Sequence, residues 1–199
     1  PGGEARGELN VGGGTLAVIG ARIGDGGLGT ALGRVALQAT RFTAEDVIAG
    51  RGPGGRAELV FSDVLAQIDR MQLDTGLWSL ERSHADVRDH LDLGADSLLH
   101  VEVDGLRRGD EYGAIDAAGA VLGGALEVDF GDLVFGGDSA VFDLLRSASA
   151  SGLAGDFVRG VSFVNVPAGY RAWGGQELDG VEIYRVHLER LAVPAPGTL

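Results

Sequence analysis

Residues Gly124–Phe130, with the sequence GALEVDF, decide the fold class, because apolar Leu126, Val128 and Phe130 alternate with polar side chains. Alternation with a period of two is typical of a β-strand that has one buried face and one solvated face. Short runs of this kind recur along the chain at residues 14–19, 33–39, 56–61, 97–103 and 180–188. The repeated pattern predicts many short strands.

Glycine separates these runs and makes up 35 of the 199 residues. Glycine adopts the positive φ angles that tight turns require, at no steric cost. Strands divided by frequent turn signals indicate an all-β protein. The longest glycine-rich break, Gly50–Gly55, is interpreted as a long turn within one domain.

Signals for helices are few. Thr43–Ile48 starts with a residue that can cap a helix and carries two acids in its first turn, so it predicts a short helix that ends at Gly50. Arg82–Leu93 is dense in charge and fits either a turn of helix or strands. Within Ser139–Ser151, residues 141–145 fit a strand and the serine and alanine residues after them fit a loop.

Two all-β architectures fit this pattern. The first is a parallel, right-handed β-solenoid (β-helix) with glycine-rich turns, in which coils of roughly 20 residues stack around one apolar interior. The second is a β-sandwich or jelly roll, in which the same strands pair in antiparallel hairpins. We expect the solenoid, as a single β-rich domain over residues 1–191, followed by a proline-rich tail over residues 192–199.

Composition excludes several classes of function. The net charge of −13, with 16 basic residues against 29 acidic ones, argues against binding to nucleic acid or to an anionic membrane surface. The absence of cysteine excludes disulfides, thiol catalysis and cysteine-type zinc sites. No run of 18 apolar residues occurs, so the sequence predicts no membrane span. The chain begins with Pro1 and not with methionine, which we interpret as processing or truncation.

The second half of the chain, from about Gly94 to Leu191, carries short motifs in a characteristic order. Their order resembles the closing coils of bacterial secreted β-helical proteins, such as autotransporter passengers and large surface adhesins. The chain departs from that family pattern by inserting Ala140 and Val141 before Phe142, and by placing Asn165 and Val166 before the proline. The motifs are DEYGAID (110–116), VLGGALEV (121–128), GDSAVFDLL (137–145), GLAGDF (152–157) and VPAGYRAW (166–173).

The C-terminal residues 193–199, VPAPGTL, are similar to the opening of a PEP-CTERM sorting signal, with Ala195 in the usual place of glutamate. The motif residues are Val193, Pro194, Ala195 and Pro196. In that family a hydrophobic helix and an arginine-rich tail follow. The resemblance implies a secreted or cell-surface protein of a Gram-negative bacterium that makes an exopolysaccharide matrix, as in a biofilm.

Catalytic candidates are sparse. Hydrolysis of a polysaccharide needs paired carboxylates about 5–10 Å apart, and its cleavage by elimination needs a carboxylate with a basic arginine or lysine. Asp86, Asp89, His90 and Asp92 form the densest group of such residues. On a strand Asp86, His90 and Asp92 would share a face, and on a helix Asp86, Asp89 and His90 would. A solvated charged face is the simpler interpretation, and we assign no catalytic, cofactor-binding or metal-binding residue.

Other short motifs match the residue patterns of known binding sites but lack the sequence context that those sites need. Gly24–Gly29 is similar to a calcium-binding β-roll turn and to a dinucleotide-binding loop, but it occurs once and lacks the required context. Calcium in a structural role is the one cofactor that this segment allows. Arg108–Asp110 spells the Arg-Gly-Asp adhesion tripeptide in an expected turn. The aromatic residues Trp78, Tyr112, Tyr170, Trp173 and Tyr184 could stack on sugars, although packing in a β core is their commoner role.

These observations predict a non-enzymatic structural protein of the cell surface or extracellular matrix, such as an adhesin or a self-assembling filament component. Its expected partners are further copies of itself and extracellular polysaccharide or the cell envelope. The alternative is a β-helix protein that binds or degrades polysaccharide.

Overall fold

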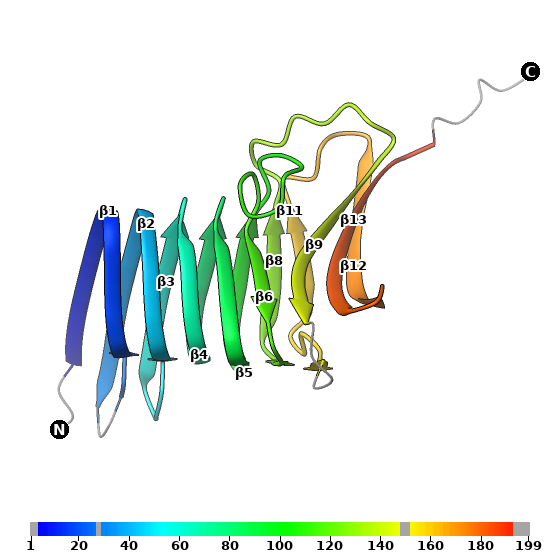
Figure 1. Cartoon of the computed structure of the whole chain (residues 1–199). Coiled ribbons are helices and arrows are strands. Elements are labelled where there is room, and N and C mark those ends of the chain that lie inside the picture. The colour runs from blue at the N-terminus through cyan, green and yellow to red at the C-terminus, as the bar shows by residue number, and fades with distance from the viewer. Residues whose placement is uncertain (1–3, 27–28, 148–151, 193–199) are drawn as a thin grey trace, which may run out of the picture.

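The computed structural model describes residues 4–26, 29–147 and 152–192, which form 13 β-strands of one mostly parallel sheet and no helix (Figure 1). All-β architecture is therefore confirmed. The strands are β1 (Glu4–Ile23), β2 (Thr30–Ala49), β3 (Gly55–Ser62), β4 (Leu65–Glu81), β5 (His84–Glu102), β6 (Ala114–Ala117), β7 (Ala120–Leu122), β8 (Ala125–Asp129), β9 (Ser139–Ser147), β10 (Leu153–Gly155), β11 (Val161–Val164), β12 (Tyr170–Leu178) and β13 (Glu182–Arg190).

Parallel pairing groups these strands into three ladders, because the long strands bend and contribute to more than one. Ladder 1 joins residues 4–12, 30–38, β3, 76–81, 97–102, β8 and β11. Ladder 2 joins residues 15–18, 41–44, 65–68, 84–87, β6 and the end of β9. Ladder 3 joins residues 20–23, 46–49, 70–73, 90–93, β7 and β10. We call one passage of the chain through the three ladders a coil.

The interior consists of apolar side chains stacked in columns from coil to coil. In ladder 1, for example, the register aligns Leu37, Phe61, Leu80, Val101 and Val128, all of which are buried. Burying a side chain of this size contributes roughly 1.5–3 kcal/mol. The alternation read from the sequence therefore corresponds to the buried faces of stacked strands, and the topology is compatible with a parallel β-solenoid.

The C-terminal end of the stack is built differently. Strand β13 pairs antiparallel with β9 on one side and with β12 on the other. Figure 1 shows this β12–β13 hairpin beyond β9, at the end of the molecule opposite to β1. The sheet therefore ends in antiparallel strands, whereas its other ladders are parallel.

The six sequence runs that predicted strands all coincide with strands, although the runs at 97–103, 124–130 and 180–188 extend one or two residues beyond them. Gly50–Gly54 forms the expected turn between β2 and β3. The helix predicted at Thr43–Ile48 is wrong, because this segment is part of β2. Arg82–Leu93, which fitted helix or strand, lies mostly in β5, and residues 141–145 lie in β9. The serine and alanine residues at 148–151 are outside the described residues.

The corner between ladders 1 and 2 repeats one backbone conformation. Gly13, Ala39, Asp63 and Arg82 all have positive φ, at +75°, +47°, +55° and +43°. Each of these residues lies two positions before the ladder 2 segment of its own coil. Left-handed backbone costs an L-residue roughly 1–2 kcal/mol, so this corner carries local strain in three successive coils.

Candidate functional site

The group Asp86, Asp89, His90 and Asp92 does not converge in the structure. Val87 pairs with Ile68 and His90 pairs with Arg70, so Arg88 and Asp89 together occupy a bulge at the corner between ladders 2 and 3. Asp86 therefore lies in ladder 2, whereas His90 and Asp92 lie in ladder 3. The shared strand face expected for Asp86, His90 and Asp92 is lost, because β5 bends between them.

Asp86 and the pair His90 and Asp92 also line separate surface grooves. Asp86 lines a groove of about 520 Å³ with Arg88, Asp116 and Arg146. His90 and Asp92 line another groove of about 290 Å³, with Arg70 on its wall. Two carboxylates that open into different grooves cannot act on one glycosidic bond.

Arginine already neutralises the acids of this surface. Arg70 donates to both carboxylate oxygens of Asp46, at 2.6 and 3.0 Å. Arg88 donates to Gln67 Oε1 at 2.9 Å and lies 3.5 Å from Asp69 and 4.0 Å from Asp86. Such exposed pairs between neighbouring coils contribute little energy each. They link the charged side chains of neighbouring coils on this face.

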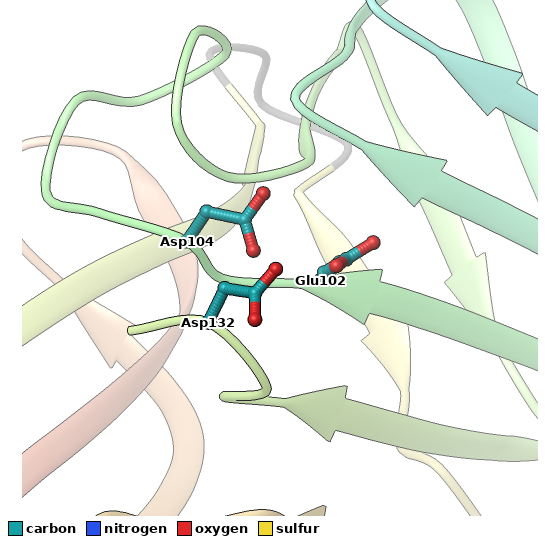
Figure 2. A group of neighbouring side chains, drawn as sticks. All are labelled: Glu102, Asp104 and Asp132. Atoms are coloured by element: carbon teal, nitrogen blue, oxygen red, sulfur yellow. The ribbon is translucent and has the colours of Figure 1, made fainter. Parts of the chain in front are cut away.

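A carboxylate cluster that sequence reasoning missed lies at the corner between ladders 1 and 2 (Figure 2). Glu102 ends β5, Asp104 follows it, and Asp132 comes shortly after β8. One carboxylate oxygen from each lies within 4.8 Å of the others. Asp104 Oδ2 accepts a hydrogen bond of 2.8 Å from Arg82, while its buried Oδ1 has no hydrogen-bond partner among the described residues.

Burial and the negative charge around it shift the pKa of Glu102, one member of this cluster. Desolvation by burial is the largest cause that raises the pKa of Glu102 to about 7, and the charges of Asp104 and Glu81 add to it. The positive charge of Arg82 opposes the rise of this pKa. Arg82 also pairs with Asp63 at 2.9 Å. Carboxylate oxygens are the ligands that a hard cation such as calcium prefers. The Gly24–Gly29 segment, named above for calcium, is not part of this cluster.

We expect Glu102→Gln to raise the melting temperature by about 2–4 °C at about pH 8, with a much smaller effect at about pH 5. The pKa of Glu102 is higher in the folded state than in the unfolded state. The ionised carboxylate therefore destabilises the folded state above about pH 7, and this destabilisation disappears as the pH falls and Glu102 is protonated. Thermal unfolding followed by circular dichroism at both pH values measures the effect. The exposed Glu45→Gln is the control, and an equal gain at both pH values would contradict the assignment.

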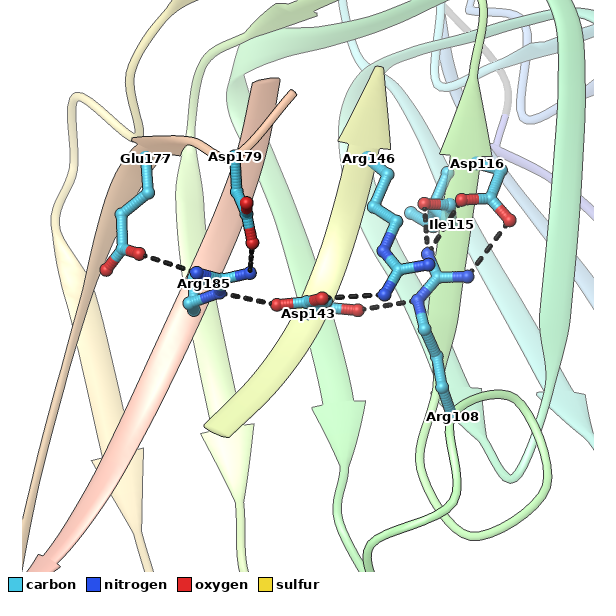
Figure 3. A network of polar contacts seen from close by, with 8 residues as sticks. All are labelled: Arg108, Ile115, Asp116, Asp143, Arg146, Glu177, Asp179 and Arg185. Atoms are coloured by element: carbon cyan, nitrogen blue, oxygen red, sulfur yellow. Dashed lines mark hydrogen bonds and ion pairs between the residues drawn. The ribbon is translucent and has the colours of Figure 1, made fainter. Parts of the chain in front are cut away.

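A second charged network crosses the junction between parallel and antiparallel strands (Figure 3). The carboxylate of Asp143 on β9 accepts hydrogen bonds from Arg146 and from Arg185 of β13, each at 2.6 Å. Arg185 also pairs with Glu177 at 2.9 Å and with Asp179 at 3.3 Å. Burial raises the pKa of Asp143, but the two arginines outweigh it and hold that pKa below its usual value. This network joins β9, β13 and β12.

The arginine of the Arg-Gly-Asp tripeptide belongs to the same network. Arg108 donates to both carboxylate oxygens of Asp116 at 2.9 Å, and to the backbone carbonyls of Ile115 and Asp143 at 2.8 Å. Its side chain is only 15% exposed. Burial raises the pKa of Asp116, but His84 and Arg108 outweigh this and lower it to about 2. Arg108 therefore serves the fold and is not presented for adhesion.

The aromatic residues divide between core and surface. Trp78, Tyr112 and Tyr184 are buried, as the commoner interpretation predicted. Trp173 on β12 is 42% exposed. Its ring stacks on His187 with a centroid separation of 5.1 Å, and the Arg171 guanidinium lies 5.0 Å from its centroid. Trp173 is thus the large aromatic side chain with the most direct access to a ligand among these five.

The proposed sorting residues Val193, Pro194, Ala195 and Pro196 lie outside the described residues. Within the described part of the chain, no helix has the length and apolar character needed to cross a membrane. Comparison of the chain with protein-family models, with curated proteins and with solved structures finds no match.

Proposed function

We propose that this protein is a parallel β-solenoid with a non-enzymatic, structural role at a bacterial cell surface or in the extracellular matrix. The observation that carries the proposal is the continuous set of stacked apolar columns inside three parallel ladders. Such a stack satisfies backbone hydrogen bonds between coils and forms a stiff rod in which each coil supports its neighbours. A function that depends on shape and rigidity suits this construction.

The distribution of charge supports the same role. The net charge of −13 keeps a rod of this kind soluble, and arginines bridge the acids of neighbouring coils, as Arg34 does between Glu8 and Glu58 at 2.8 and 2.9 Å. The acids that could act on a glycan are spread over separate grooves. Export and surface attachment are part of the proposal, and the β-helical motifs of residues 94–191 and the VPAPGTL tail support them.

Two measurements test this function. Incubation with acidic and neutral polysaccharides is expected to release no sugar, and fractionation of cells that express the full-length gene is expected to place the protein outside the cytoplasm. Sugar release that is lost in Asp89→Asn would overturn the non-enzymatic role. A protein that stays in the cytoplasm would overturn the surface role.

The second candidate function is binding of polysaccharide, and the exposed Trp173 favours it. A tryptophan ring at a sheet surface can pack against a sugar ring, and Arg171 and Glu189, which pair at 2.6 Å, supply polar groups beside it. Glycan binding measured by calorimetry would support this role if Trp173→Ala removed it. The control is Leu178→Ala, on the same strand and 80% exposed.

A further inference from the structure

A surface groove of about 590 Å³ crosses the outer face of ladder 1. Its walls come from β2, β3, β4, β5 and β8, which lie side by side along the stack (Figure 1), and from Arg159 just before β11. The groove therefore runs along the stack and crosses the strands. Its volume falls within the range of about 300–1,000 Å³ that is typical of sites for small molecules.

One wall of the groove is an apolar column. The register places Leu77 of β4 opposite Leu98 of β5, and Leu98 opposite Ala125 of β8. These side chains alternate with buried neighbours, so they point outward from ladder 1, and all three are half-buried. Leu32 of β2, which also lines the groove, is 37% exposed. The groove thus presents partly exposed aliphatic surface, and contact with an alkyl chain would remove this surface from water.

The groove also contains an arginine that has no acidic partner. Arg56 of β3 is exposed and makes no hydrogen bond or ion pair among the described residues. The two acids that line the groove already have arginines beside them: Glu58 accepts a hydrogen bond of 2.9 Å from Arg34, and Asp96 lies 3.5 Å from Arg159. A guanidinium can bind a carboxylate through two parallel hydrogen bonds. The side chain of Arg56 is therefore available for the carboxylate of a ligand.

We propose that this groove binds a free alkyl carboxylate, a molecule with a linear hydrocarbon chain and one carboxylate group. The carboxylate accepts hydrogen bonds from Arg56, and the chain lies against Leu77 and Leu98. One unpaired cation suits a ligand with one negative charge, whereas a protein of net charge −13 would repel a polyanion. A neutral polysaccharide would bring no anion to Arg56. This inference adds a binding function to the structural role proposed above and does not depend on that role.

Titration calorimetry of the purified chain with sodium decanoate tests the proposal. We expect decanoate to bind with a Kd of about 0.1–1 mM, as befits a ligand with few atoms. Octanoate, which is two methylenes shorter, is expected to bind about threefold or more weakly, because each buried methylene adds to the affinity. Acetate, which lacks the alkyl chain, and decylammonium, which carries the opposite charge, are expected to show no measurable binding.

Variants separate the two halves of the site. Arg56→Gln is expected to weaken decanoate binding about tenfold, and Arg56→Lys, which keeps the charge, is expected to retain most of the affinity. The matched control is Arg41→Gln, at an exposed arginine of ladder 2 outside the groove, which is expected to leave binding unchanged. Leu98→Asp places a negative charge on the apolar wall and is expected to abolish binding. Melting curves identify any variant that does not fold, and the Arg56 variants keep the test independent of Leu98→Asp.

Several results would overturn the proposal. These are a lack of decanoate binding up to about 5 mM, equal binding of decanoate and decylammonium, and equal effects of Arg56→Gln and Arg41→Gln. Binding of an oligogalacturonide without binding of decanoate would assign the groove to an acidic glycan and would also overturn it. None of these results bears on sugar release or on surface localisation, which test the proposed function separately.

Discussion

Replacing Gly50 with alanine is expected to lower the free energy of unfolding by about 3–4 kcal/mol. Gly50 directly follows the ladder 3 segment of β2 and has a φ of +66°, a conformation that costs an L-residue roughly 1–2 kcal/mol. A Cβ at this position would also overlap the carbonyl oxygen of Thr75 in the next coil. Forcing extra atoms into a packed site adds roughly 1–3 kcal/mol. Urea denaturation, followed through the fluorescence of the buried Trp78, measures the loss.

The matched control is the reverse substitution at the other corner. Ala39 is exposed and has a φ of +47°. Ala39→Gly removes the strain of the left-handed backbone but raises the conformational entropy of the unfolded chain. The free energy of unfolding is therefore expected to stay constant or to rise by up to about 1 kcal/mol. Equal effects of Gly50→Ala and Ala39→Gly would contradict the proposal that close packing between coils requires glycine at position 50.

Asp143→Ala is expected to cost about 2–3 kcal/mol at neutral pH. The side chains of Asp143 and Arg185 are only 14% and 16% exposed, and removing one partner of a largely buried ion pair leaves the other uncompensated. In this variant Arg185 still pairs with Glu177 and Asp179. The decrease in the free energy of unfolding is therefore smaller than for an ion pair with no other partner. Because Asp143 joins β9 to β13, we expect the β12–β13 hairpin to open before the rest of the molecule. Hydrogen exchange would then be faster for the backbone amides of β12 and β13.

The pH dependence of this effect has a defined sign. The pKa of Asp143 is lowered in the folded state, so its contribution is present above the unfolded pKa and is lost as the pH falls through the folded value. Asp143→Asn keeps an oxygen acceptor without the charge. The difference in unfolding free energy between wild type and Asp143→Asn is expected to shrink from pH 7 toward about pH 3. A difference that grows on acidification would contradict the assignment.

The strands were predictable because period-two runs report directly on a buried face. The helix predicted at Thr43–Ile48 failed for a specific reason. That prediction rested on Thr43 as a cap and on the two acids, Glu45 and Asp46, that follow it. In the structure Glu45 forms the corner between ladders 2 and 3, as the register step from Ala44 to Asp46 shows. A polar, acidic corner within a strand carries the same residue types as the first turn of a helix.

The candidate sites were less predictable, because they depend on which coils stack. Asp86 and His90 are close in sequence, yet the bulge at Arg88 and Asp89 turns them onto different ladders. Glu102 and Asp132 are 30 positions apart, and they meet because β8 stacks on the last part of β5. Alternation indicates which side chains point inward, but it does not give the register between coils.

The register has a consequence for how such chains can change over evolutionary time. Leu65 stacks on His84, 19 positions later, whereas Leu126 stacks on Val161, 35 positions later, and the strand pairing is parallel in both cases. Extra residues, such as those of the segment between β5 and β6, lie outside the ladders. Insertions and deletions at corners can therefore accumulate while the columns stay intact, so descendants can lose every recognisable period and still keep one architecture.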